Sequence, residues 1–384
     1  MVSSTYHEPP VPLHSAGDAP AVQASAPAAK VRVEWIDYAK GICIFFVVML
    51  HVNDHVQDRA LATSWLDHVI AFARPFRMPD FFLIAGLFLA NAIRRPWRRY
   101  LDSKVVHFLY FYLLWTTLRF GLYDLPHLVR QDGASAQEIV WMYVRRWIDP
   151  IGSLWFIHIL PLFFVVTRLT RRVPPGWIWL GAATLHSLQI QTSWHVINQV
   201  VLRYVYFYSG YVLAPHVFRI TSWARTHARG ALGYLACWGV LNALLVTAGW
   251  AALPFVSLAL GYAGALAVIL VAVLLSKRSW ARPVRYLGES SIVVYLGEFW
   301  VGLLVTRALA PLIGDLGALA LISTPITVIG AILLWRVVLR TPASFLYVRP
   351  RWLRLAAAPR PQDPPSAAAE APAAPALGEQ AARP

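Results

Sequence analysis

The sequence predicts an all-α, polytopic helical bundle in a membrane, and three observations lead to this prediction. Of the 384 residues, 58% are hydrophobic and only 14% are charged, whereas a soluble domain carries roughly 25% charged residues. The apolar residues gather in about ten runs, each near the roughly 20 residues that a helix needs to cross a bilayer. Lysine and arginine recur in short clusters between these runs, as the positive-inside rule requires.

The apolar runs give about ten expected transmembrane helices. A further segment, 64–75, is amphipathic, and we expect it at the membrane interface or inside the mouth of the bundle. The ten expected spans are 34–54, 76–93, 103–121, 152–169, 175–191, 196–215, 230–250, 252–275, 288–309 and 317–340.

The basic clusters predict the orientation. Connections 94–104, 168–175, 216–229 and 276–285 together hold about fifteen Lys and Arg with few acids, which predicts that they face the cytoplasm. Both termini are then cytoplasmic, and we expect a multi-pass protein of the cell's inner (plasma) membrane. The net charge of +15 could suggest nucleic acid. However, the basic residues form no single patch, so we expect membrane lipids and no nucleic acid as partners.

Composition divides the chain into a membrane domain and two tails. Residues 1–30 and 355–384 are rich in alanine and proline and are predicted to be disordered. The membrane domain is expected over 31–345. The two cysteines, Cys43 and Cys237, show no metal-type spacing; we interpret both as small buried apolar residues and expect no metal site.

The first apolar run, KGICIFFVVMLH, carries a titratable group at each end. Lys40 and His51 are 11 residues apart, which is about three helical turns or 16 Å, so they lie on one face of the helix. Asp37 shares that face. Ionisable groups inside a membrane usually serve function. Snorkelling to the two interfaces explains Lys40 alone but explains His51 less well.

The residue types on this face suggest a chemistry. A neutral imidazole can take a proton from a hydroxyl, and a lysine on the cytoplasmic side can hold an anion. Glu298 lies in mid-membrane, where an unpaired carboxylate is costly; we expect it to pair with a base or to be protonated. His158 is expected to be a bonded core residue, and Arg77 and Asp80, three residues apart, could form a pair.

Two further segments leave alternatives open. The basic segment RRPWRRYLDSK suits a polyphosphate ligand, but anionic lipids or orientation alone also explain it. The long connection 122–151 could hold an acceptor on the outer face, or could be an interfacial helix with aromatic residues.

The stretches DYAKGICIFFVVMLH, FRMPDFFLIAGLF, RRPWRRYLDSK, GSLWFIHILPLFF and LGESSIVVYLGEF, in this order, resemble the acyltransferase-3 family of integral membrane acyltransferases. The resemblance covers about residues 33–340. Lys40 and His51 match the family's basic residue and essential histidine, and the lysine resembles the fucose O-acetylase-like branch. Glu298 stands where many members have a histidine, and Arg77 and Asp80 replace commoner residues.

The resemblance implies an acyl-CoA donor, generally acetyl-CoA, used as co-substrate with no permanently bound cofactor. It implies a hydroxyl of an extracytoplasmic or lipid-linked glycan as acceptor. We therefore expect an O-acyltransferase with His51 as general base and Lys40 supported by Asp37. Glu298 is a further supporting residue, and donor phosphates would lie against Arg94, Arg95, Arg98 and Arg99. A proton-coupled transporter is the alternative, because intramembrane acids and bases also form proton relays.

Overall fold

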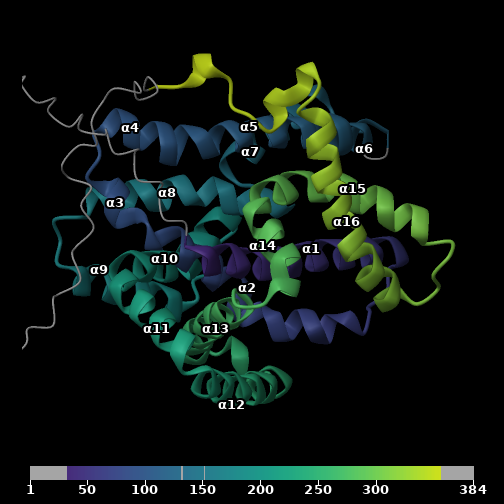
Figure 1. The fold of residues 1–384 in the computed structure, drawn as a ribbon. Coiled ribbons are helices and arrows are strands. Elements are labelled where there is room, and N and C mark those ends of the chain that lie inside the picture. Colours follow the sequence, from purple (N-terminus) through teal and green to yellow (C-terminus); the bar gives the residue numbers. More distant parts are fainter. Residues whose placement is uncertain (1–32, 131–132, 151, 356–384) are drawn as a thin grey trace, which may run out of the picture. The chain divides into compact units, whose positions relative to one another are not determined.

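The computed structural model describes residues 33–130, 133–150 and 152–355, and in these residues all of the regular secondary structure is helical, with no strand (Figure 1). The predicted tails, 1–30 and 355–384, lie outside the described residues apart from Leu355. The elements are α1 Glu34–Ala60, α2 Leu66–Leu87, α3 Leu89–Ile93, α4 Trp97–Leu101, the π-helix η1 Asp102–Val106, α5 His107–Arg119, the π-helix η2 Phe120–Asp124, α6 Leu125–Arg130, α7 Ala136–Ile148, η3 Gly152–Leu154, α8 Trp155–Leu169, α9 Pro175–Leu188, α10 His195–Val212, α11 Ala214–Thr226, α12 Ala228–Thr247, η4 Trp250–Ala252, α13 Pro254–Leu275, η5 Ser279–Ala281, α14 Arg282–Glu289, α15 Ser291–Leu309, α16 Leu316–Val338, η6 Pro342–Leu346 and η7 Arg351–Leu353.

The first helix is the centre of the packing. α1 contacts α2, α13, α14, α15 and α16, and Figure 1 shows it running through the middle of these helices. Most of its apolar residues are buried. The helix that carries Lys40 and His51 is therefore surrounded by protein, as expected for polar groups at membrane depth.

A helix lies over each of the ten predicted spans, which confirms the all-α polytopic bundle. Among the described residues, seven helical segments are long and apolar enough to cross a membrane. The helices over the other three predicted spans are α2, α9 and α10. α9 has only 14 residues, fewer than the roughly 17 that a perpendicular crossing needs. Ten crossings and cytoplasmic termini therefore stay predictions.

The second helix differs from the sequence expectation. Segment 64–75 was expected to be a separate amphipathic element, but its residues from Leu66 onward form the first half of α2. Pro75 and Pro79 lie inside this helix. Proline removes one backbone donor and usually kinks a helix, yet α2 continues through both residues.

Glycines allow two close helix contacts that position the site. A Cβ added at Gly86 of α2 would lie 2.1 Å from the Phe207 carbonyl oxygen of α10. A Cβ at Gly288 of α14 would lie 1.6 Å from the Asp37 carbonyl oxygen of α1. Backbones can approach this closely only where a side chain is absent. α14 therefore lies directly against the N-terminal half of α1.

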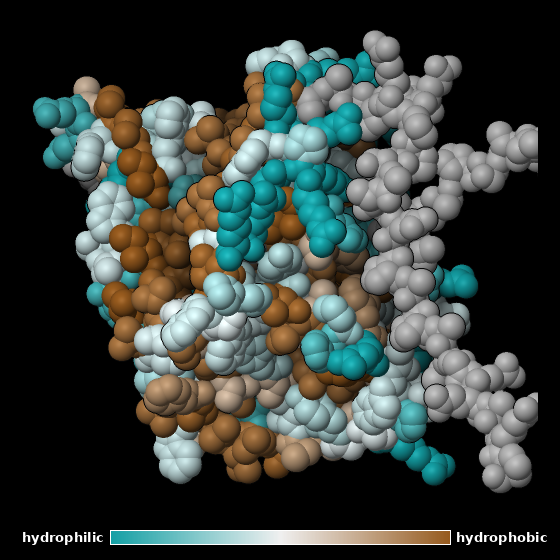
Figure 2. Space-filling view, turned by 90° about the vertical axis from the view of Figure 1, so that its left-hand side faces the viewer, coloured by the Kyte–Doolittle hydropathy of each residue, from teal (hydrophilic) through white to brown (hydrophobic). Residues whose placement is uncertain are grey.

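The outer surface is rich in apolar side chains, as a lipid-facing surface requires. Figure 2 shows hydrophobic residues forming a broad area on one face of the molecule, with hydrophilic side chains toward its top. Leu232, Val240 and Leu244 of α12 are exposed, as are Ile329 and Leu333 of α16. Cys237 of α12 is exposed too. Its expected burial in protein was wrong, because hydropathy alone does not separate a residue facing lipid from one facing protein.

Two segments outside the long helices pack in an ordered way. In the long connection, α7 is amphipathic and begins with a capping box between Ser135 and Glu138, which satisfies two free backbone N–H groups. After α16, residues up to Leu355 fold back onto α5: the hydroxyl of Tyr110 and the indole of Trp115 donate to backbone carbonyls of η6.

Candidate functional site

The site begins with a contact that joins the first helix to α15. Nδ1 of His51 lies 2.8 Å from Oε1 of Glu298, and the two residues are 247 positions apart in sequence. The Glu298 side chain is 1% exposed. An ionised Glu298 accepts the hydrogen bond from Nδ1, which would leave Nε2 as the free ring nitrogen. The contact fixes the orientation of the His51 ring.

Both ends of the predicted polar face open onto one cavity. Its volume is about 330 Å³, and Lys40 and His51 both line it. This volume falls within the roughly 300–1,000 Å³ of small-molecule sites. Most of the lining is apolar, from α1, α2, α8 and α15. Lys40 and His51 thus lie on one face of α1, as their spacing predicted, and that face borders the cavity.

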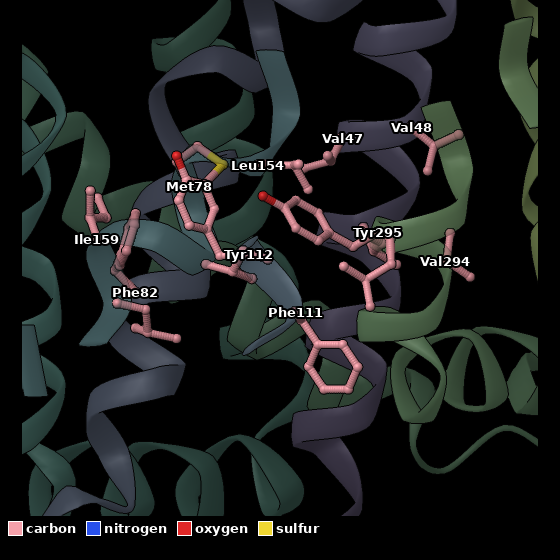
Figure 3. Close-up of a cluster of buried hydrophobic side chains, with 14 of the residues drawn as sticks. Val47, Val48, Met78, Phe82, Phe111, Tyr112, Leu154, Ile159, Val294 and Tyr295 are labelled. Atoms are coloured by element: carbon pink, nitrogen blue, oxygen red, sulfur yellow. The ribbon is translucent and has the colours of Figure 1, made fainter. Parts of the chain in front are cut away.

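Apolar side chains form the wall beside His51. Tyr295 of α15 lines the cavity, and its hydroxyl donates to the backbone carbonyl of Ser153. Figure 3 shows Val47, Leu154 and Tyr295 in one buried cluster. These residues connect α1, η3 and α15 in the wall of the cavity.

The described side chains of Lys, Arg, Asp or Glu type that line the cavity are all cationic. Nζ of Lys40 lies 3.6 Å from Oδ1 of Asp37, so the two residues are within ion-pair distance of each other. Lys104 also lines the cavity, and its Nζ lies 4.6 Å from the ring centre of Phe164. No Asp or Glu appears among the described lining residues, whereas Lys40, Arg77 and Lys104 do. The walls therefore favour an anionic ligand.

Lys104 was missed by the sequence analysis. It belongs to η1, a π-helix between α4 and α5. Helices of this type shift the register of side chains by one residue, and they are common at functional sites. The sequence placed Lys104 at the end of the basic segment but gave no signal that it turns inward.

The four predicted donor-binding arginines lie elsewhere. Arg94, Arg95, Arg98 and Arg99 are exposed and do not appear among the described lining residues of the cavity. The segment is held by Arg168 of α8, which donates 2.6 Å to the backbone carbonyl of Arg95. Its guanidinium also stacks over the aromatic rings of this segment, Trp97 and Tyr100.

The predicted pair between Arg77 and Asp80 is not formed. Asp80 instead accepts from the Cys43 thiol, with Sγ 2.9 Å from Oδ2. Arg77 lines the cavity and is 9% exposed. Its Nε and Nη1 have no hydrogen-bond partner in the described part of the chain. A buried cation without a partner is costly.

The remaining polar residues near the site have structural contacts. His158 does not appear among the described lining residues; its ring packs on Tyr112 with 4.4 Å between centres, although its Nδ1 has no hydrogen-bond partner among the described residues. Asn53 donates to Asp67 at 2.8 Å and accepts from Ser64 at 2.7 Å. These bonds fasten the end of α1 to the start of α2.

Comparison with known proteins identifies the family. A family model described as an acyltransferase domain matches residues 33–336, and this match covers most of the chain. The chain belongs to this acyltransferase family. The cavity, His51 and Glu298 all lie within the matched residues. No solved structure gives a significant match.

Two curated proteins are similar over part of their length. Inner membrane protein YcfT of Escherichia coli (strain K12) is 24% identical over 201 residues, which are 47% of this chain and 56% of that protein. Nodulation protein NolL of Mesorhizobium japonicum is 25% identical over 149 residues, 38% of each chain. The matches thus span about half of the first relative's length and less of the second's.

Proposed function

We propose that this membrane acyltransferase moves an acyl group, acetyl by the family resemblance, from cytoplasmic acyl-CoA to a hydroxyl of an extracytoplasmic or lipid-linked glycan. The observation that carries the proposal is the 2.8 Å contact between His51 and Glu298 in the wall of a cavity that Lys40 also lines. A base held by an acid, in reach of an anion-binding wall, is the arrangement that acyl transfer to a hydroxyl needs.

Acyl-CoA, the donor, would enter the cavity at the end where Lys40 and Lys104 lie. Lys40 and Lys104 would hold its phosphates, and the apolar middle of the cavity would take the pantetheine arm. The exposed Arg94, Arg95, Arg98 and Arg99 would attract the polyphosphate to the entrance, a role that needs no contact with the cavity. Asp37, 3.6 Å from Lys40, would orient the ammonium group.

The chemical step would take place at His51. Nε2 takes the proton of the acceptor hydroxyl as the hydroxyl oxygen attacks the thioester carbonyl carbon. Glu298 stabilises the imidazolium that forms. The carbon–sulfur bond then breaks, and the thiolate of CoA takes the proton from His51. Neither cysteine is needed as an acyl carrier, since Cys43 donates to Asp80 and Cys237 is exposed.

We also propose a cellular location for the protein and a branch of the family to which it belongs. The positive-inside pattern and the similarity to an inner membrane protein support a multi-pass protein of the inner membrane with the donor side in the cytoplasm. Lys40 at the basic position supports the fucose O-acetylase-like branch. The transporter alternative gains no support from the family match.

Labelled acetyl-CoA supplied to inside-out membrane vesicles tests the function. We expect label to enter glycan in wild-type vesicles and to be lost in His51→Ala at equal abundance. His158→Ala is the matched control, because this half-buried histidine is not among the described residues that line the cavity, and it should retain labelling. Equal labelling in wild type and His51→Ala would contradict the role of His51 as base.

A further inference from the structure

Arg77 lies at the depth between Lys40 and His51. Asn53 bonds to Asp67 and Cys43 to Asp80, so α1 and α2 run antiparallel with Cys43 level with Asp80. At 1.5 Å per residue, Arg77 begins level with Cys43 when counted from the Asn53–Asp67 bond, and about 4.5 Å toward the outer end when counted from the Cys43–Asp80 bond. His51 lies about 12 Å from the Cys43 level in the same direction. Lys40 lies about 4.5 Å in the opposite direction.

The direction of the side chain brings the guanidinium closer to His51. Side chains on a helix lean toward its N-terminus, and the N-terminus of α2 is on the same side as the C-terminal half of α1. A long arginine side chain therefore spans much of the axial distance that separates Arg77 from His51.

Arg77 makes no hydrogen bond through Nε or Nη1 within the described ranges, where both atoms are buried. Asp54 is the acid whose charge acts on it. The nearest acid in sequence, Asp80, accepts from Cys43. Arg77 lines the cavity, and a guanidinium held in place there is preorganised for charge that develops on a ligand.

We propose that Arg77 is a catalytic residue that donates to the thioester carbonyl oxygen of the acyl donor and stabilises the oxyanion of the tetrahedral intermediate. This inference rests on the proposed acyl transfer. The acceptor oxygen bonds to the carbonyl carbon, the carbonyl π electrons move onto the oxygen held by Arg77, and the hydroxyl proton goes to His51. Collapse re-forms the carbonyl and expels the CoA thiolate.

The test compares wild type with Arg77→Met, Arg77→Lys and a control, Arg307→Met, at equal membrane abundance. Arg307 of α15 is exposed and is not among the described lining residues. We expect Arg77→Met to lower kcat about 100- to 1,000-fold with little change in the KM for acetyl-CoA. Arg77→Lys should keep part of the activity, and Arg307→Met most of it.

Two donor analogues separate a contact with the carbonyl from a contact with the rest of CoA. S-ethyl-CoA lacks the thioester carbonyl, and the analogue with methylene in place of the thioester sulfur keeps that carbonyl as a ketone. Arg77→Met should weaken binding of the ketone analogue several-fold and leave S-ethyl-CoA within about twofold. Equal weakening of both analogues, or activity of Arg77→Met within about threefold of wild type, would overturn the role of Arg77. Failure of the proposed function would be visible separately, as a wild-type protein that transfers no acyl group and binds neither analogue.

Discussion

Replacing Glu298 by Gln removes the charge that orients His51 while keeping the shape of the side chain. The contact between Nδ1 and Oε1 is 2.8 Å long and the Glu298 side chain is 1% exposed, so solvent does not screen it. A hydrogen bond to a charged group contributes about 1.5–3 kcal/mol. At about 1.4 kcal/mol per factor of ten, Glu298→Gln should lower kcat roughly 10- to 150-fold.

The assay is acyl transfer from acetyl-CoA in purified membranes, with kcat and KM measured separately. We expect the loss in kcat and little change in the KM for acetyl-CoA, because Glu298 acts through His51 and is not among the described residues that line the cavity. Glu289→Gln is the matched control. Glu289 lies on α14 in an ion pair with Arg285 at 3.0 Å, and its replacement should leave kcat within about twofold.

A double-mutant cycle provides the decisive comparison. If Glu298 acts only by orienting His51, it has nothing to orient in His51→Ala, and the double variant should match that single variant within about threefold. If the kcat losses of the two single variants multiply in the double variant, the effect of Glu298 does not come from its pairing with His51. A Glu298→Gln variant with wild-type kcat would refute the orienting role itself.

Three further outcomes follow from other contacts. Lys40→Arg should keep more activity than Lys40→Met, with the KM for acetyl-CoA raised most in the methionine variant; equal values in the two variants would rule out anion binding by Lys40. Arg349→Met should lower the free energy of unfolding by about 3 kcal/mol, read from thermal unfolding in detergent, because Arg349 donates to both carboxylate oxygens of Asp102 at 2.8 and 2.9 Å; an unchanged Tm would contradict this. The N–H of Ala318 and the indole of Trp65 lower the pKa of Asp315, so its stabilisation is present above the ordinary carboxyl pKa and is lost as pH falls through the lowered value. The Tm deficit of Asp315→Ala should therefore be clear at pH 7 and shrink under strong acid, and a deficit independent of pH would count against it.

The sequence predicted what depends on one helix and missed what depends on the register between helices. Asp37, Lys40 and His51 belong to α1, where a period of 3.6 residues fixes the shared face. The partner of Glu298 could not be named, because it depends on how α15 packs beside α1. The cost of an isolated carboxylate predicted a partner or a proton, and the structure supplies His51.

The sequence predictions that failed did so because of single contacts or short segments. Arg77 and Asp80 have the spacing of a helical pair. However, α1 packs on α2 so that the Cys43 thiol, and not Arg77, donates to Asp80. Lys104 turns inward because η1 has the wider turn of a π-helix, which composition does not reveal. Cys237 satisfies the hydropathy of its helix while facing outward.

The distribution of charge in the cavity connects these results. Lys40 has a carboxylate 3.6 Å away, Lys104 has the face of Phe164, and Nε and Nη1 of Arg77 have no hydrogen-bond partner among the described residues. Arg77 also lies nearer than Lys40 to the depth of His51. A buried cation that is not hydrogen-bonded to an acid destabilises the empty protein, and it is available when negative charge develops on a bound donor. This difference gives the cations different tasks: Lys40 and Lys104 suit a permanently charged phosphate, whereas the Arg77 guanidinium suits a charge that exists only during acyl transfer.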